Sequence, residues 1–194
     1  MSVLTTDRLL IRPWRDDDRE PFAQLNADPH VMEHYPASLS RTESDARVDE
    51  IVEHFAEQGW GLWAVELRAT RQFIGFVGLW PRPYVTGGPM VEIGWRLARS
   101  HWGRGYATEA ARAVLRFGFE HLELDEIVSF TVPQNQRSRR VMERIGLHHD
   151  HGRDFDHPRV DPTTHPHLVR HVLYAITRAD WEAQVSPSSP NAAP

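Results

Sequence analysis

The chain has 194 residues, of which 40% are hydrophobic and 25% are charged, the balance of one soluble globular domain. It contains no cysteine, which excludes a disulfide scaffold, a thiolate metal site and a cysteine nucleophile. All 22 basic residues are arginine, so a Schiff-base lysine and a Walker A lysine are also excluded, and the net charge of -5 disfavours non-specific nucleic-acid binding.

The ends of the chain bear on location and domain organisation. The N-terminal MSVLTTDRLLIRPW carries charges where an export signal needs an apolar core, and the longest nearly apolar stretch, Phe73 to Trp80, is too short to span a bilayer. We therefore expect a cytoplasmic protein that makes no membrane contact. We expect one domain over residues 1–182 and a disordered tail over 183–194, because SPSSPNAAP is small and polar.

In the first half of the chain, a strand over 3–13 precedes the acidic run Asp16-Asp17-Asp18. That run can cap a helix over roughly 19–27, with Glu20 completing a capping box with Asp17. After the loop VMEHYP, Ser40 or Thr42 can cap a second helix that ends at Gly59. Period-two hydrophobicity then predicts strands over 61–67, 72–79 and 91–98, the first two as a hairpin.

In the second half, the clearest helix follows SHWGRGYATEA, because small and apolar residues recur from Ala107 to Gly118 at helical spacing. A strand over 127–132, a helix over 138–145 and a strand over 169–176 follow. The His- and Asp-rich segment 148–167 is expected to be loop with room for one strand. This order predicts an α/β (α+β) domain with a mostly antiparallel sheet and one βαβ crossover.

The turn before the clearest helix carries the strongest chemical signal. Gly103 and Gly105 lack a Cβ, so the backbone can turn tightly and expose its amides. The first amides of a helix have no intrahelical partner and lie at the positive end of its dipole, which favours a phosphate. Arg99 and Arg104 can add charge-assisted hydrogen bonds. Thr108 replaces the third glycine of a dinucleotide fingerprint, so a plain strand-to-helix turn remains an alternative.

Several segments together resemble the GNAT N-acetyltransferases, in particular their RimJ/RimL-like branch of ribosomal-protein-alanine acetyltransferases. They are TDRLLIRPWRDDD, FIGFVGL, VEIGWRLA, WGRGYATEA, IVSFTVPQN, NQRSRRVMERIGL and HVLYAITRADW, and they cover roughly residues 5–182. The resemblance implies the GNAT fold, a splayed mixed but mostly antiparallel sheet flanked by helices. It also implies acetyl-CoA (coenzyme A) as co-substrate, a protein N-terminus or small-molecule amine as acceptor, and a homodimer.

The resemblance further implies which residues hold the cofactor. In such enzymes the strand matching 91–98 binds the pantetheine arm through its backbone, and the loop amides matching 103–108 bind the pyrophosphate. Asn135 matches a position that bonds the cofactor near its thioester, and Ser138 matches the serine of the branch's N-x-x-S pattern. The implied set is Ile93, Gly94, Trp95, Arg96, Leu97, Arg99, Trp102, Gly103, Arg104, Gly105, Tyr106, Ala107, Thr108, Asn135 and Ser138.

Two positions depart from the family pattern. Ser100 stands where glutamine or arginine is common, and Met142 stands where many members have tyrosine as general acid. A thioether cannot donate a proton, so Ser138 or an ordered water becomes the candidate donor to the leaving thiolate.

Direct attack on the thioester requires a neutral amine. An α-amine, with a pKa near ~8, meets this requirement more easily than a lysine near about 10.4. Glu92, beside the proposed cofactor groove, is the first candidate base, and the alternative is an ion-paired strand residue. Glu33 is the second candidate, and with Tyr35 it lies in the loop expected to face the acceptor.

Other features leave alternatives. Arg137 and Arg140 can contact the phosphates of coenzyme A or simply form a solvated helix face. A non-catalytic acyl-CoA sensor or scaffold, and a nucleotide-binding protein using the same glycine turn, are rival functions. The histidines of the C-terminal third match no known metal motif, so a solvated loop and no metal cofactor are expected. They are His148, His149, His151, His157, His165, His167 and His171.

Overall fold

The computed structural model describes residues 2–83 and 90–185. No helix within these residues combines the length and apolarity that crossing a membrane requires. The strands are β1 (Leu4–Thr5), β2 (Leu9–Arg12), β3 (Leu62–Leu67), β4 (Phe73–Arg82), β5 (Met90–Leu97), β6 (Glu126–Thr131), β7 (His148–His149), β8 (Phe155–Asp156) and β9 (Arg170–Thr177). The α-helices are α1 (Arg19–Ala27), α2 (Arg41–Gln58), α3 (Tyr106–Glu120), α4 (Gln136–Arg144) and α5 (Arg178–Val185).

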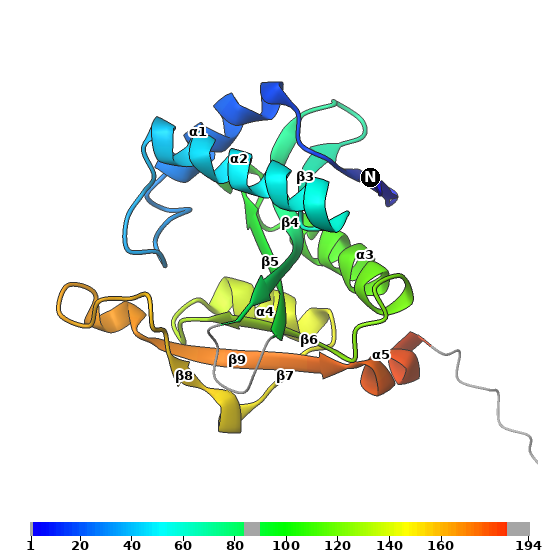
Figure 1. The fold of residues 1–194 in the computed structure, drawn as a ribbon, viewed down its shortest axis with the longest axis vertical. Helices are drawn as coiled ribbons and strands as arrows, with labels where there is room; N and C mark the ends of the chain where they lie inside the picture. The colour runs from blue at the N-terminus through cyan, green and yellow to red at the C-terminus, as the bar shows by residue number, and fades with distance from the viewer. Residues whose placement is uncertain (1, 84–89, 186–194) are drawn as a thin grey trace, which may run out of the picture.

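The strands form one mixed sheet, as predicted for an α+β GNAT fold (Figure 1). Among the described residues the order is β1-β2-β3-β4-β5-β6-β9-β7, and β8 pairs with β9. Neighbours are antiparallel except β5 and β6, which are parallel. Helix α3 makes the crossover between these two strands, because parallel strands need a long connection.

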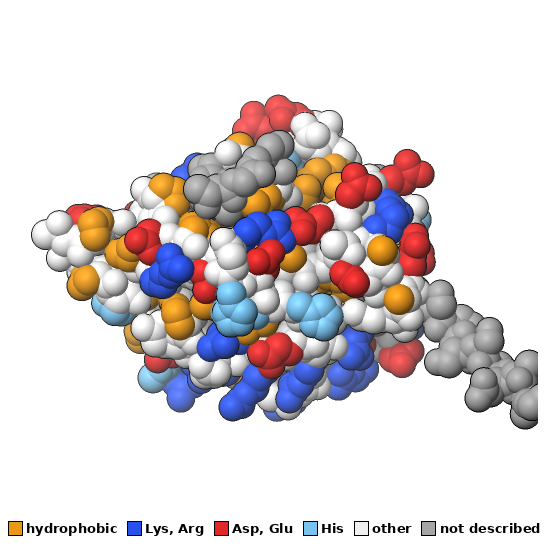
Figure 2. All heavy atoms as spheres, turned by 90° about the horizontal axis from the view of Figure 1, so that it is seen from below, with side chains coloured by type: hydrophobic (Ala, Val, Ile, Leu, Met, Phe, Trp, Pro, Cys, Tyr) orange, Lys and Arg blue, Asp and Glu red, His pale blue; other side chains and the backbone are white. Residues whose placement is uncertain are grey.

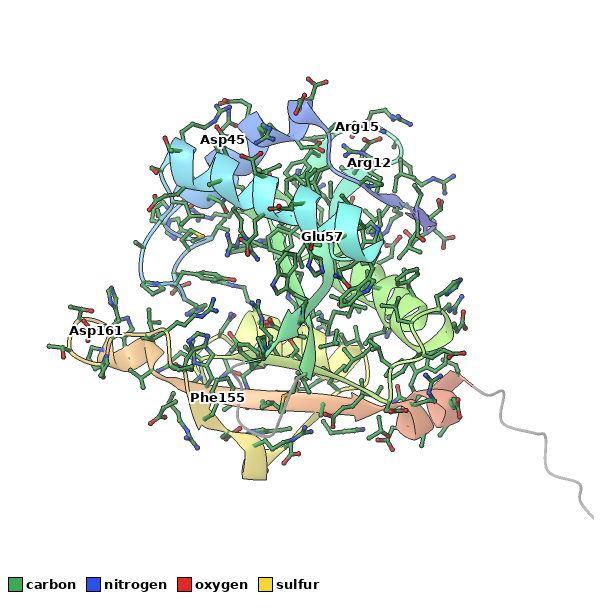
Figure 3. All side chains as sticks on the ribbon, in the orientation of Figure 1. Arg12, Arg15, Asp45, Glu57, Phe155 and Asp161 are labelled. Carbon is green, nitrogen blue, oxygen red and sulfur yellow. The ribbon has the colours of Figure 1, made fainter. Side chains whose placement is uncertain are left out.

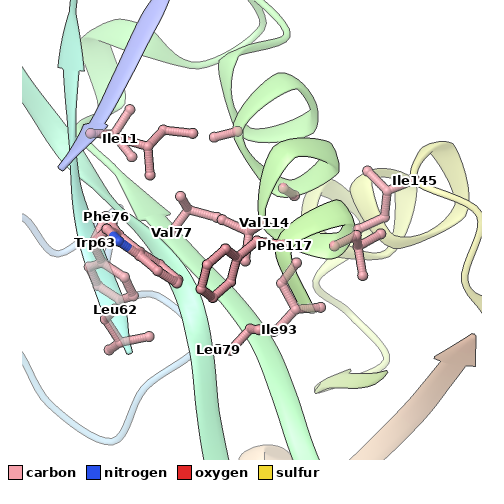
Figure 4. Packing of buried hydrophobic residues seen from close by; sticks show 14 of the residues in the cluster. Ile11, Leu62, Trp63, Phe76, Val77, Leu79, Ile93, Val114, Phe117 and Ile145 are labelled. Carbon is pink, nitrogen blue, oxygen red and sulfur yellow. The ribbon is translucent and has the colours of Figure 1, made fainter. Parts of the chain in front are cut away.

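The two faces of the sheet are covered by different helices. On one face, Phe22 of α1 meets Phe76 of β4 with ring centroids 6.0 Å apart. On the other, Phe117 of α3 lies edge-on to Trp63 of β3, 5.2 Å away, and packs beside Ile93 of β5 (Figure 4). Ile93 therefore faces α3. Because successive strand residues point to opposite faces, the other odd-numbered residues of β5 face α3 as well.

The predicted single strand over 3–13 is wrong, because the chain folds back on itself there. Strands β1 and β2 pair antiparallel, with Leu4 opposite Ile11. The turn between them is closed by Thr6, whose backbone N–H donates to the Leu9 carbonyl at 3.0 Å and whose hydroxyl accepts from the Leu9 N–H at 3.0 Å. A local side-chain to backbone bond therefore divides what hydrophobic alternation presents as one strand.

The acidic run also differs from its predicted role. Residues Asp16–Asp18 form a 3₁₀ turn, and instead of an Asp17–Glu20 capping box Asp18 turns inward toward Arg12. Both Arg12 Nη atoms donate to the Asp18 carboxylate at 2.7 and 2.8 Å, and Arg12 Nε donates to Glu66 at 2.7 Å. Figure 3 labels Arg12 on the ribbon. All three side chains are buried, so this network fixes the start of α1 against β2 and β3.

Local signals at α2 are confirmed. Ser40 is its N-cap: the hydroxyl accepts from the Glu43 N–H, and the Glu43 carboxylate accepts from the Ser40 N–H at 2.8 Å. Gly59 ends the helix with a left-handed φ of 76°. Such a capping box and glycine stop depend on neighbours in sequence, which is why the sequence alone predicts them.

The C-terminal region holds more structure than expected. Helix α5 includes residues 183–185 of the predicted tail, and Trp181 anchors it by stacking on Phe119 at 5.2 Å. Residues 186–194 of that tail lie outside the described residues. Two short strands, β7 and β8, occur in segment 148–167 in place of one.

Gly78 and Gly94, which face each other across β4 and β5, provide a matched test of the packing. A Cβ at Gly78 would lie 2.2 Å from the Gly61 carbonyl oxygen, whereas a Cβ at Gly94 would meet nothing within 4 Å. We expect Gly78→Ala to lower the free energy of unfolding by about 1–3 kcal/mol, because backbone must move. Gly94→Ala should leave it nearly unchanged. Urea denaturation of both variants measures this, and equal losses would contradict the strand packing.

Candidate active site

The central feature of the site is the parting of β5 from β6. The two parallel strands share a single register pair, Glu92 with Val128. Beyond it, β5 remains paired with β4 as far as Leu97, while β6 is paired along its length with β9 (Figure 1). In the part of the chain that the structure describes, residues 93–97 therefore have a strand neighbour on one edge only.

The peptide groups on the other edge of β5 can be identified. The Ala98 N–H donates to the Ile74 carbonyl of the β4 side at 2.9 Å. Because successive peptide groups alternate in direction, those of Leu97, Trp95 and Ile93 face away from β4. Trp102 confirms this, since its indole N–H donates to the Leu97 carbonyl at 2.8 Å. The Ile93 N–H lies at the register pair with Val128, whereas the Ile93 carbonyl and the Trp95 peptide groups can pair with an extended ligand lying between the strands.

The glycine turn lies at the end of this open edge. Gly103 and Gly105 have φ angles of 73° and 79°, a left-handed conformation that other residues adopt at a cost. Gly105 is the N-cap of α3, and the first intrahelical bond runs from the Glu109 N–H to its carbonyl at 3.0 Å. The helix begins at Tyr106 as predicted, and its first-turn amides lack intrahelical partners.

A clamp that the sequence did not reveal holds this turn. Glu109 of α3 accepts hydrogen bonds from the Thr6 hydroxyl and from Arg8 Nε, both at 2.6 Å. Arg8 in turn donates to the Arg104 carbonyl at 3.0 Å and lies 4.6 Å over the Tyr106 ring. Partial burial acts to raise the pKa of the Glu109 carboxyl, but the bonds from Thr6 and Arg8 outweigh it and lower that pKa.

Glu92 lies on the even-numbered face of β5, opposite α3. Its carboxylate is buried and accepts from Arg82 Nε at 2.5 Å. Desolvation raises the pKa of Glu92, although the charges of Arg82 and Arg47 act against this rise. The ion pair favours the structural interpretation of Glu92, while the raised pKa suits a general base.

Two neighbours of Glu92 on the same face shape the surroundings. A Cβ on Gly94 would meet no atom within 4 Å, so there is open space over this residue. Arg96 donates to Asn26 Oδ1 at 2.6 Å and lies 4.2 Å over the ring of Tyr35. Arg96 Nε is buried without a hydrogen-bond partner among the described residues. Tyr35, which is exposed, is therefore placed by its ring contact with Arg96, a residue on the same face of β5 as Gly94.

Glu33 lies in the same loop as Tyr35 but points toward α4. Its carboxylate accepts from Arg137 at 2.9 Å, and the Arg137 guanidinium lies 4.5 Å over the Trp102 ring. Loop 28–39, the turn before α3 and the start of α4 therefore meet at Arg137. Glu33 is exposed and ion-paired, which disfavours it as a base.

The start of α4 brings the remaining predicted residues to the site. Asn135 is the N-cap: its Oδ1 accepts from the Ser138 N–H at 3.2 Å and its amide donates to Thr131 at 3.0 Å. Ser138 is half-buried in the first turn, and Met142 is buried. Because β5 and β6 are parallel, the N-termini of α3 and α4 lie at the same end of the sheet. The predicted residues are thereby brought together around the open edge.

Comparisons with known proteins are consistent with this geometry. Residues 8–148 match the model of the acetyltransferase (GNAT) domain. The chain is 35% identical over 149 residues to the uncharacterized protein YkkB of Bacillus subtilis (strain 168), covering 76% of this chain and 86% of that protein. It is 33% identical over 195 residues to FsC-acetyl coenzyme A-N(2)-transacetylase of Aspergillus fumigatus, covering 96% and 80%.

A solved structure agrees in fold. The GNAT-family acetyltransferase from Bacillus anthracis superposes with a TM-score of 0.76 at 24% identity, covering 92% of this chain and 99% of that one. The family match spans well over half of this chain. The chain belongs to the GNAT acetyltransferase family and is an acetyl-CoA-dependent N-acetyltransferase.

Proposed function

We propose that the protein transfers acetyl from acetyl-CoA to a primary amine at the point where β5 and β6 part. The observation that carries this proposal is the open edge of β5 leading directly to the glycine turn of α3. Such an arrangement suits a ligand with an extended arm that ends in a pyrophosphate. The same two features are the ones that the sequence resemblance implies for coenzyme A.

In this proposal the backbone binds the cofactor. The Ile93 carbonyl and the Trp95 peptide groups pair with the pantetheine arm, and the amides from Gly103 to Thr108 bind the pyrophosphate at the positive end of α3. Arg99 and Arg104, whose side chains are exposed beside the turn, supply charge to the phosphates. Asn135 caps α4 and donates one hydrogen of its side-chain amide to Thr131, which leaves the second hydrogen to bond the cofactor near its thioester.

The reaction follows from the residues around Gly94. The amine nitrogen attacks the thioester carbonyl carbon, a C–N bond forms, and the C–S bond breaks as the thiolate leaves. Glu92 takes the proton that the amine loses, directly or through water, and Ser138 or a water donates a proton to the thiolate. The peptide N–H groups on the open edge of β5 are suited to stabilise the oxyanion.

The acceptor is proposed as a cationic or N-terminal amine. The net charge of -5 attracts a cation, and a Cβ on Gly94 would meet no atom within 4 Å, so there is open space on this face of β5. The resemblance to the RimJ/RimL-like branch favours a protein N-terminus. The name of the Aspergillus relative specifies transfer to an N(2) atom, which supports a nitrogen acceptor.

A panel of amines tests the activity and identifies the acceptor class. Peptides with free Ala, Ser or Met N-termini, polyamines and aminocyclitol antibiotics are each mixed with acetyl-CoA, and released thiol is measured with a colorimetric reagent. The protein contributes no background, because it has no cysteine. We expect turnover with one class of amine. Tight acetyl-CoA binding without turnover of any amine would contradict the proposal and support the alternative function, a non-catalytic acyl-CoA sensor.

The role of Glu92 is tested by Glu92→Gln. We expect kcat to fall by about 100- to 10,000-fold, with the Kd for acetyl-CoA unchanged, because the base is lost and the backbone site is kept. In the wild type, activity should decline on acidification at a pH above the pKa of an ordinary glutamate. The sign follows from the raised pKa of Glu92, since protonation removes the base. This acid limb should disappear in the variant.

Glu53→Gln is the matched control, because Glu53 is an exposed carboxylate of α2 and its replacement also removes one negative charge. The thermal midpoint of both variants is measured to separate catalysis from the loss of the Arg82 ion pair. A folded Glu92→Gln enzyme with wild-type kcat and pH profile would refute the catalytic role and leave the ion-pair interpretation.

A further inference from the structure

A second cluster of metal-binding types of side chain lies at the β7 edge of the sheet, outside the proposed acetyl-transfer site. It consists of His149 on β7, His151 at the start of the 3₁₀ helix η3 (His151–Arg153), and Asp154 just after it. Figure 2 shows histidine side chains together with acidic and arginine side chains on the face seen from below. None of these groups has a role in the proposed reaction.

The geometry of the three residues fits a single cation. One potential ligand atom from each lies within 4.8 Å of the other two. His149 Nε2 is 2.9 Å from Asp154 Oδ1. In a tetrahedral zinc site with metal–ligand bonds of about 2.0–2.1 Å, ligand atoms are roughly 3.3 Å apart. Small side-chain rotations, chiefly of the exposed His151, bring all three atoms to that spacing.

Two of the three ligands are held in place from behind. The ring of His149 stacks on Tyr174 of β9, with centroids 5.0 Å apart and planes 10° from parallel. Asp154 Oδ1 also accepts the Leu173 N–H at 3.0 Å, which orients the carboxylate. In metal sites, hydrogen bonds and packing from surrounding residues orient the ligating side chains in the same way.

The electrostatic surroundings also favour a cation. Two arginines near the cluster are each paired with acids. Arg153 is paired with Glu126 at 2.7 Å and with Asp150 at 2.8 Å, and Arg170, whose charge acts on Asp154, is paired with Asp156 at 3.3 Å. An open cavity of about 530 Å³ adjoins the cluster, and its lining includes His149 and His151 together with Glu126, Asp150 and Asp180. A bound ion can therefore keep a water ligand on its solvent side.

We propose that His149, His151 and Asp154 form a binding site for a divalent transition-metal ion of the zinc class. Two imidazoles and one carboxylate suit zinc, nickel or cobalt rather than the oxygen-preferring magnesium or calcium. The sequence predicts no metal here because H-x-H-x-x-D matches no familiar motif. The bound ion would join His149 of β7 and His151 of η3 to Asp154, whose carboxylate is held against β9 by the Leu173 N–H.

The test uses full-length protein without a polyhistidine tag, treated with a chelator that is then removed. Zn²⁺ is titrated by calorimetry, and Co²⁺ is added separately because its visible absorption reports coordination by nitrogen and oxygen. The variants are His151→Ala and Asp154→Asn, the second of which keeps a carbonyl oxygen for the Leu173 N–H. His167→Ala is the matched control, because His167 is an exposed histidine of the same region outside the cluster.

We expect one Zn²⁺ per chain in the wild type and in His167→Ala, with a thermal midpoint that rises on Zn²⁺ addition. Both cluster variants should bind at least tenfold more weakly and lose that rise while remaining folded without metal. The absence of stoichiometric binding in the wild type would overturn the proposal. Equal affinity of wild type and both cluster variants, or an equal loss in His167→Ala, would overturn it as well.

Discussion

The separation of β5 from β6 after a single register pair is the constraint on which the rest of this structure depends. Parallel strands require a crossover, and α3 supplies it, so the N-termini of α3 and α4 meet at the end where the strands have parted. A row of peptide groups then faces the opening. Peptide groups away from water need hydrogen-bond partners, and a ligand lying along the strand supplies them.

In the proposed function, the backbone binds the cofactor, and side chains bind the acceptor and transfer protons. Cofactor binding in this proposal rests on peptide groups of β5 and on the glycine turn, so it does not require a particular side chain at Ser100. The same proposal assigns acceptor binding and proton transfer to the opposite face, where Glu92 and Arg96 are the neighbours of Gly94 along β5. The clamp between Arg8 and Glu109 fixes the glycine turn to the start of the sheet.

The elements that the sequence predicts well are those with local causes. The start of α3 at Tyr106, the Ser40 cap of α2 and the stop at Gly59 follow from neighbours within a few positions. The Thr6 turn was missed because hydrophobic alternation continues across it. Helix α5 was missed because Trp181 is its one buried residue, which leaves little periodic signal.

Side-chain pairs between distant segments were beyond sequence reasoning. The pairs Arg8 with Glu109 and Arg137 with Glu33 join residues about a hundred positions apart, and nothing local marks either partner. The structure places the candidate residues of β5, the glycine turn and the start of α4 at one end of the sheet, and their roles stay predictions. The environment of Glu92 could be described only from the fold. The cluster of His149, His151 and Asp154 likewise gains meaning only from the backing that β9 provides.

Amide hydrogen exchange along β5 tests the central claim most directly. The account predicts that coenzyme A slows exchange at Trp95 and at the first-turn amides of α3. Exchange at Val65, an interior β3 residue paired on both sides, should not change. Saturating coenzyme A that leaves Trp95 unprotected would contradict the account, because the open edge of β5 would then not be the cofactor site.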